Sequence, residues 1–239
     1  MTINRPDTMV LSTEDGTKVT VRLEINDKAR RLILRLDERS RQAVAVAPNR
    51  RKLPDAAQFA AERVDWIADR LAELPPAISL APGATFPLRG EPCKISLEGP
   101  GRRARLIHGD GLVLRVPGDP ETTPQRVIRF LRTEAKRDLE RSVVRHCKIL
   151  HRQPRAISVK DTRSRWGSCT SDGRLSFSWR LIMAPPDVLE YVAAHECAHL
   201  LEMNHSPAFW AHVSRCCADW KIHRRWLREE GRALHAVGV

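Results

Sequence analysis

Hydrophobic and polar positions alternate between residues 10 and 47, as they do in strands with one buried face. Val10–Ser12 and Lys18–Leu23 flank Glu14-Asp15-Gly16, and an Asp-Gly pair is typical of a tight hairpin turn. Two further apolar runs, Leu32–Leu36 and Ala43–Ala47, lie on either side of a polar turn. The pattern predicts two pairs of strands.

The period changes to that of a helix after this segment. Apolar residues recur at helical spacing from Pro54 to Leu74, and Pro75-Pro76 ends the predicted helix. Glycines then separate three short strand candidates, which are Cys93–Leu97, Ala104–Ile107 and Leu112–Val116. No internal repeat is visible in the sequence.

Helical patterns dominate the rest of the chain. A long basic helix is predicted from Pro124 to about His151, and a helix is expected to open at Pro185-Pro186. Strands are predicted at Ile157–Val159 and Arg174–Ile182, and later helices from Pro207 and from about Ile222 to Ala236. We therefore predict an α+β fold with a β-rich N-terminal region (1–118, with one helix) and a second domain over 119–239.

Basic residues are in excess and are unevenly distributed. The chain has 41 Lys and Arg against 29 Asp and Glu, a formal net charge of +12, and a pI of about 10.1. Two stretches concentrate the excess, one from Arg126 to Arg152 and one from Arg215 to Arg232. Such stretches attract polyanions, of which nucleic acid is the commonest. The alternative is a solvated helix face interleaved with acidic residues.

Other classes of protein are excluded or disfavoured. No run of ~18 apolar residues is present, so no membrane-spanning helix is predicted. The stretch from Met1 to Val21 has no apolar core of a secretory signal, which places the protein in the cytoplasm. The six cysteines include no C-x-x-C pair, and reduced thiols are expected.

One short motif carries candidate metal chemistry. His195-Glu196-Cys197-Ala198-His199 matches H-E-x-x-H, and at ~3.6 residues per turn both imidazoles lie on one face of a helix. Glu196 is offset from them and lies beside the ion, where its carboxylate can accept a proton from the metal's water. Two half-buried structural histidines would give the same letters, so the residues around the motif matter.

Those residues favour a catalytic zinc site. His205 follows His199 after a plausible helix end, and Asn204 suits a left-handed turn back toward the metal. Three histidines with one open position are typical of catalytic zinc. Arg174–Ile182 precedes the helix and is predicted to be an edge strand that flanks it and pairs with an extended peptide.

From Ile157 to Trp226 the chain resembles the YgjP-like (SprT-like) metallopeptidase family. The resemblance is carried by Arg165-Trp166-Gly167-Ser168-Cys169, the run Tyr191–Leu200, Met203-Asn204-His205-Ser206-Pro207 and Phe209-Trp210. It implies a zincin-like peptidase core with one catalytic Zn²⁺, the ligands His195, His199 and His205, and Glu196 as general base. Glu202 stands where metzincins have glycine, so their particular turn is not implied.

Several neighbours are candidates for supporting roles. Arg165, Trp166 and Ser168 either line the substrate cleft, where Arg165 or a backbone N–H stabilises the oxyanion, or form a tight loop that packs Trp166 into the core. Tyr191 either supports the site or packs in the core. Phe209 and Trp210 are predicted apolar anchors of the His205 segment. Glu202 and Asp219 are predicted acceptors for a ligand imidazole.

The sequence thus predicts a zinc metallopeptidase that hydrolyses peptide bonds of a peptide or protein substrate. The alternative is a nucleic-acid-associated protein that uses the zinc fold as a scaffold. The two combine in a protease that acts on DNA-bound proteins. No membrane partner is predicted.

Overall fold

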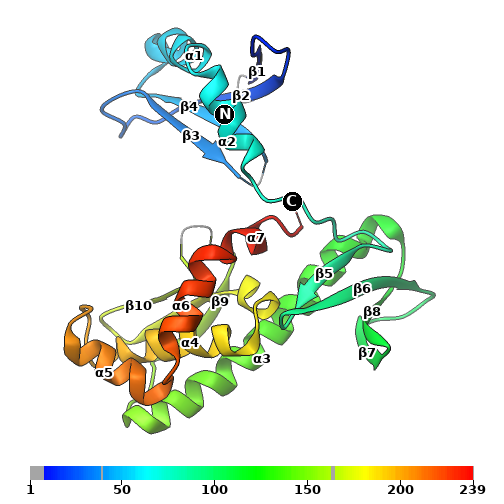
Figure 1. Cartoon of the computed structure of the whole chain (residues 1–239), viewed down its shortest axis with the longest axis vertical. Coiled ribbons are helices and arrows are strands. Elements are labelled where there is room, and N and C mark those ends of the chain that lie inside the picture. The colour runs from blue at the N-terminus through cyan, green and yellow to red at the C-terminus, as the bar shows by residue number, and fades with distance from the viewer. Residues whose placement is uncertain (1–7, 39, 163–164, 239) are drawn as a thin grey trace, which may run out of the picture. The chain divides into compact units, whose positions relative to one another are not determined.

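The computed structural model describes residues 8–38, 40–162 and 165–238, and its contacts divide the chain into two compact units, Met1–Pro76 and Ala77–Val239 (Figure 1). The sequence placed a boundary between residues 118 and 119. The contacts instead group residues 77–118 with the C-terminal part of the chain. The architecture is α+β, as predicted.

The first unit is a four-stranded sheet covered by two helices. Its strands are β1 (Thr8–Ser12), β2 (Lys18–Ile25), β3 (Ile33–Asp37) and β4 (Gln42–Ala47), in the order β1-β2-β4-β3. Both predicted strand pairs are antiparallel, and β2 joins them by pairing in parallel with β4. The core is formed by residues such as Val21, Ala45 and Ile67, all fully buried.

The single helix predicted over residues 54–74 is two helices, α1 (Leu53–Ala61) and α2 (Val64–Ala72). The backbone N–H of Arg63 donates to the carbonyl of Ala60 rather than to that of Phe59. The Arg63 guanidinium donates to the Phe59 carbonyl instead, at 3.3 Å, and stacks on the Phe59 ring. A side chain thus satisfies the carbonyl that the break leaves open.

The second unit begins with a sheet of the same topology. Strands β5 (Thr85–Leu88), β6 (Glu91–Glu98), β7 (Arg105–Gly109) and β8 (Gly111–Pro117) are ordered β5-β6-β8-β7. As in the first sheet, the two outer pairs are antiparallel and the central pair is parallel. The two four-stranded sheets therefore share one strand order, although the sequence shows no internal repeat. The strand β5 was missed, because only Phe86 and Leu88 mark its buried face.

The predicted long helix is α3 (Thr123–Leu150), which follows this sheet and contributes many residues to the core of the second unit. Its buried residues include Val127, Leu131, Leu139 and Val143. Arg89, in the β5–β6 turn, donates to Asp138 and Glu134 on α3 at 2.9 and 2.8 Å. Arg89 has φ of 52°, which the two-residue hairpin between paired Leu88 and Glu91 requires.

A three-stranded sheet follows α3 in the chain and contacts it through β9. Strand β11 (Arg174–Ser178) lies in its centre, parallel to β9 (Ala156–Lys160) and antiparallel to β10 (Gly167–Cys169). The prediction of an edge strand over 174–182 is therefore wrong. The two edge strands are β9 and β10, of which β10 lies within the predicted loop. Trp179–Met183 is a 3₁₀ turn capped by Ser178. All five residues of that turn are buried. The apolar residues at 179 and 181 that continued the strand pattern are therefore part of a buried turn and not of one face of a strand.

The remaining helices are α4 (Pro186–Ala198), α5 (Pro207–Cys216), α6 (Trp220–Glu229) and α7 (Gly231–His235). The last predicted helix is thus divided in two at Glu230. Within the described residues, none of the helices is long and apolar enough to cross a membrane.

Replacing Leu139 with Ala tests the role of α3. Leu139 is fully buried, so the substitution removes apolar contacts and leaves a cavity. We expect the free energy of unfolding to fall by about 2–5 kcal/mol in urea denaturation. The control is Val144→Ala on the same helix, where the side chain is 67% exposed. Its effect should stay within about 0.5 kcal/mol. Equal effects of the two substitutions would contradict this account of the core.

Candidate active site

Helix α4 brings two of the three histidines of the motif together. Pro186 opens the helix, His195 lies in its last turn, and His199 is the residue that caps its C-terminal end. Four residues apart, the two rings lie on the same side, with their centroids 5.0 Å apart.

The turn after α4 returns the third histidine to the first two. The Asn204 side chain accepts a hydrogen bond from the N–H of Ser206 at 3.0 Å, and the Ser206 hydroxyl accepts one from the N–H of Phe209. Asn204 does not have the left-handed backbone that was predicted; it acts through its side chain. The result is that Nε2 of His205 lies 3.2 Å from Nε2 of His195.

The three imidazoles form a donor set of the size that one ion requires. One ring nitrogen from each of His195, His199 and His205 lies within 4.8 Å of the other two. Nδ1 of His199 lies 2.9 Å from the backbone carbonyl of Glu202. A carbonyl oxygen can only accept, so this contact puts the proton on Nδ1 and leaves Nε2 with a free lone pair. Glu202 is thus the acceptor for a histidine of the triad, as predicted, through its backbone carbonyl.

Phe209 forms an apolar floor beneath the triad. Its ring centroid lies 4.9 Å from that of His195, 4.5 Å from that of His199 and 4.8 Å from that of His205. The side chain is fully buried. Trp210 stacks on Trp220 with centroids 4.1 Å apart, which ties α5 to α6. Both residues were predicted as anchors of the His205 segment, and Phe209 also contacts the other two imidazoles.

The environment keeps the imidazoles of His195 and His199 neutral. Burial lowers the pKa of His195 to about 3, and the neighbouring His199, His205 and Arg224 contribute to the lowering. Burial also lowers the pKa of His199. A neutral imidazole with a free lone pair is the form that binds metal. The donor set, its spacing and its protonation therefore fit a divalent transition metal.

Glu196 is enclosed by the strand that faces α4. Its side chain is only 5% exposed, and burial raises its pKa to about 8, against the opposing effect of the Arg165 charge. A Cβ atom added to Gly167 in β10 would lie 2.5 Å from Oε1 of Glu196. The strand can approach the carboxyl this closely only because residue 167 has no side chain. A glycine in a strand often marks such an approach, and this signal was available in the sequence.

Glu196 and His195 share a small pocket with part of the predicted substrate set. The pocket has a volume of about 180 Å³, and it is lined by Trp166, Gly167, Tyr191, Val192, His195, Glu196 and Leu227. Arg165 and Ser168 are not among its lining residues, although the charge of Arg165 acts on Glu196.

Trp166 and Tyr191 both line the pocket and pack against other side chains, so they combine the two alternatives that the sequence left open. Trp166 stacks on His235 with ring centroids 4.6 Å apart and also lines the pocket. Tyr191 is 6% exposed, and its ring meets that of His195 edge-on with centroids 6.0 Å apart. Burial raises the pKa of the Tyr191 hydroxyl to about 12, so it stays protonated at neutral pH.

Comparison with known proteins identifies the family of the chain. Residues 30–230 match the family model described as "YgjP-like, metallopeptidase domain". No curated protein matches the chain in sequence. One similar solved structure is the metallopeptidase zymogen of Pyrococcus abyssi abylysin, with 17% identity and a TM-score of 0.34 over 39% of this chain and 96% of that one.

The family model covers most of the chain, including the histidine triad, Glu196 and β10. The family implies a metal ion and peptide or protein substrates. The chain therefore belongs to the YgjP-like metallopeptidase family, and it is a peptidase.

Proposed function

We propose that this peptidase depends on zinc, with His195, His199 and His205 as the ligands and Glu196 as the general base. The observation that carries the proposal is the convergence of three ring nitrogens within 4.8 Å of one another beside a buried carboxyl group. Three nitrogen donors with one open position suit catalytic zinc. The proposal includes a zincin-like core, in which the edge strand β10 packs on α4.

Zinc bound at these imidazoles would polarise the peptide carbonyl and make a water molecule acidic at neutral pH. Glu196 takes the proton from the attacking water and passes it to the leaving amine. Its enclosure by Gly167 fixes the position of the carboxyl group. Burial raises its pKa, which makes the ionised carboxylate a stronger base in the first step and stabilises the protonated form that donates to the amine in the second. Trp166 and Tyr191 limit the space beside it.

Strand β10 is the proposed place for the substrate backbone. It is an edge strand of its sheet, and its Gly167 touches Glu196. An extended peptide that pairs with β10 would bring a carbonyl group next to that carboxyl. We propose Arg165, Ser168, Trp166 and Tyr191 as contacts along this path, with Arg165 adding positive charge near the oxyanion.

A cytoplasmic location is part of the proposal. All six cysteines are free, including Cys147 and Cys197, whose sulfur atoms are 3.6 Å apart. Unpaired thiols at this distance fit a reducing compartment.

Glu196→Gln separates metal binding from catalysis. The amide keeps the size of the side chain but cannot accept the proton, so kcat for a casein or peptide-library substrate should fall by about 10²–10⁴-fold. Zinc content, measured by atomic emission on the same preparation, should equal that of the wild type. Full activity in this variant would remove Glu196 from the mechanism.

His205→Ala tests the ligand that lies outside the five-residue motif. Loss of a residue that only supports a ligand weakens metal binding by up to about 100-fold. Loss of a direct ligand should therefore weaken zinc binding by at least about 100-fold. The matched control is His108→Ala, another exposed histidine, on strand β7 of the other sheet of this unit. Competition with a chelating dye measures both affinities. Unchanged affinity in His205→Ala would remove it from the ligand set.

Gly167→Ala tests the contact between β10 and Glu196. The new methyl group would displace the carboxyl, since its nearest atoms lie at 2.5–2.8 Å. We expect kcat to fall by about 10²-fold or more, as misplacement of a catalytic group by ~1 Å does, while zinc content stays unchanged. The control is Gly109→Ala, where no atom lies within 4 Å of the added Cβ. Wild-type kcat in Gly167→Ala would show that the close approach is not needed for hydrolysis.

A further inference from the structure

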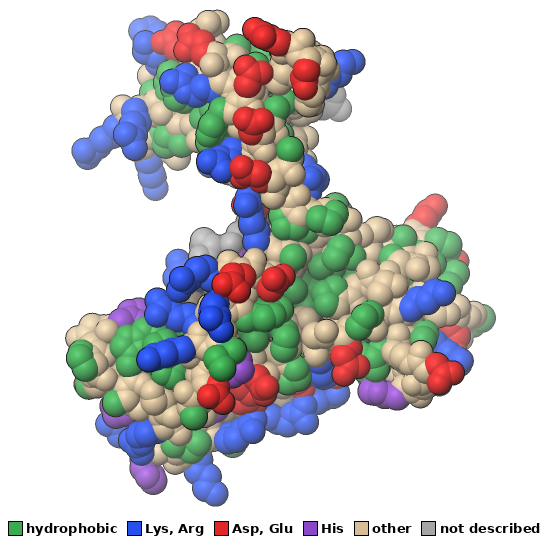
Figure 2. Space-filling model, in the orientation of Figure 1, with side chains coloured by type: hydrophobic (Ala, Val, Ile, Leu, Met, Phe, Trp, Pro, Cys, Tyr) green, Lys and Arg blue, Asp and Glu red, His purple; other side chains and the backbone are tan. Residues whose placement is uncertain are grey.

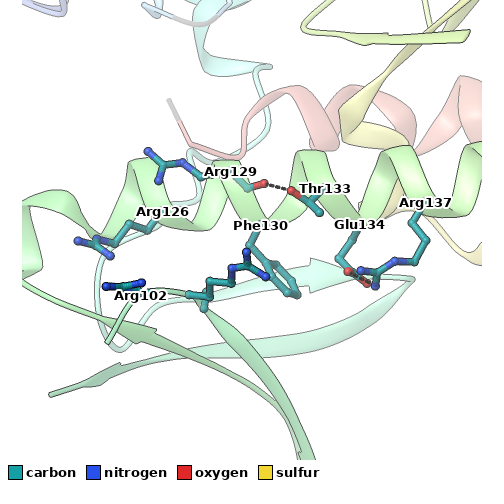
Figure 3. A pocket seen from close by; sticks show the side chains of 9 residues that line it. Arg102, Arg126, Arg129, Phe130, Thr133, Glu134 and Arg137 are labelled. Atoms are coloured by element: carbon teal, nitrogen blue, oxygen red, sulfur yellow. Dashed lines mark hydrogen bonds and ion pairs between the residues drawn. The ribbon is translucent and has the colours of Figure 1, made fainter. Parts of the chain in front are cut away.

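A second concave site, formed mainly by arginines, lies on the second unit away from the residues of the active site. It has a volume of about 510 Å³ and lies between α3 and the segment that precedes β7 (Figure 3). We call it the arginine cleft, and its lining residues are Arg102, Arg103, Ala104, Arg126, Arg129, Phe130, Thr133, Glu134 and Arg137. Five of these nine side chains carry guanidinium groups.

Two features of the sequence bring these arginines together. Arg126, Arg129, Thr133 and Arg137 are spaced three or four residues apart, so they share one face of α3. The loop that carries Arg102 and Arg103 packs against the end of β8, where a Cβ on Gly101 would lie 2.9 Å from Cβ of Pro117.

Most of this positive charge is not neutralised by the protein. Further along α3, acidic residues pair with the basic ones: Arg137 with Glu134, Arg141 with Asp138, and Arg145 with Glu190. That part of the helix fits the alternative of a solvated, paired face. Within the described chain, Arg102, Arg103, Arg126 and Arg129 form no ion pair with a carboxylate. The Lys and Arg side chains that Figure 2 shows along the lower edge of the unit lie where the later, ion-paired part of α3 runs.

We propose that the arginine cleft binds single-stranded nucleic acid through its phosphodiester backbone. One guanidinium group can donate two parallel hydrogen bonds to the oxygens of a phosphate. Arginines that form no ion pair with a carboxylate can do so without first breaking such an ion pair. From Arg126 to Arg137 the row extends over about 16 Å of helix, long enough to face several phosphates of one strand.

The exposure of the cleft favours a strand over a small phosphate compound or a duplex. A pocket for a small ligand buries most of that ligand, whereas four of the five arginines here are exposed and Arg126 is partly buried. Ala104 and the partly buried ring of Phe130 add an apolar surface among the charges. An unpaired base can pack there, as bases do on aromatic residues of single-strand-binding proteins.

The experiment measures binding of the full chain to a labelled single-stranded oligonucleotide by fluorescence anisotropy between about 50 and 200 mM salt. The test variant is Arg102→Gln with Arg103→Gln, and the control is Arg30→Gln with Arg31→Gln. Both are adjacent exposed pairs that precede a strand, and both remove two charges.

We expect the Arg102/Arg103 variant to bind about tenfold more weakly than wild type and the control to stay within about twofold. In a plot of log K against log[salt], each phosphate that an arginine neutralises contributes about −0.7 to the slope for a single strand. If both arginines neutralise phosphates, the slope for the variant should therefore be shallower by about 1.4. Arg126→Gln with Arg129→Gln should act in the same direction. Unchanged thermal unfolding will show that each variant is folded.

Three results would overturn the proposal. The first is equal binding by the Arg102/Arg103 variant and the wild type, or equal weakening by the control. The second is displacement of the strand by inorganic phosphate as effectively as by unlabelled strand, which identifies a small-anion site. The third is equal affinity for a duplex of the same sequence. Separate DNA and RNA strands distinguish the two sources of this chemistry, and specific binding of either supports the proposal.

Discussion

The geometry of the active site depends on how closely β10 approaches α4. Gly167 lets the backbone of the strand touch the carboxyl of Glu196, at a distance where a methyl group would have no room. The central strand β11 holds β10 in this position through a register that pairs Gly167 with Phe177. The N–H of Ser178 then donates to the carbonyl of Trp166 at 2.8 Å, which extends the pairing by one bond. The edge strand β10, where we propose that the substrate binds, and the carboxyl group are thereby held side by side.

Helix α3 links the core of the second unit to its charged surface. Its apolar face is buried under the sheets and α4, while Glu134 and Asp138 receive Arg89 from the β5–β6 turn. These partly buried acids also pair with Arg137 and Arg141 on the same helix. Acidic residues are absent from the first turn of α3, and Arg126 and Arg129 near its start lack such partners. The same helix therefore has a neutralised surface in its middle and a positive one near its start.

Local patterns predicted most of the elements but not the way they pair. The motif of His195, Glu196 and His199 was readable because helical spacing alone places two imidazoles on one face. The edge strand was assigned to 174–182, because alternation there was stronger than in the three residues of β10. Only the sheet order, set by contacts between distant segments, shows that β11 is central. The arginine cleft was invisible for the same reason, since Arg102 and Arg126 come from separate elements.

The histidine triad and the arginine cleft differ in how far their charged or chargeable groups are removed from water, and this difference explains their different chemistry. At the triad, Phe209 lies beneath the three rings, and burial keeps His195 and His199 neutral, which preserves the lone pairs that a metal needs. At the arginine cleft most of the arginines are exposed to water, so they keep their charge at little cost, and binding of a polyanion is favoured by the release of its counterions. A compact set of three ring nitrogens, with His195 and His199 held neutral by burial, favours one tightly held ion. An exposed row of cations favours a long anion held by many weak contacts, with an affinity that depends on salt.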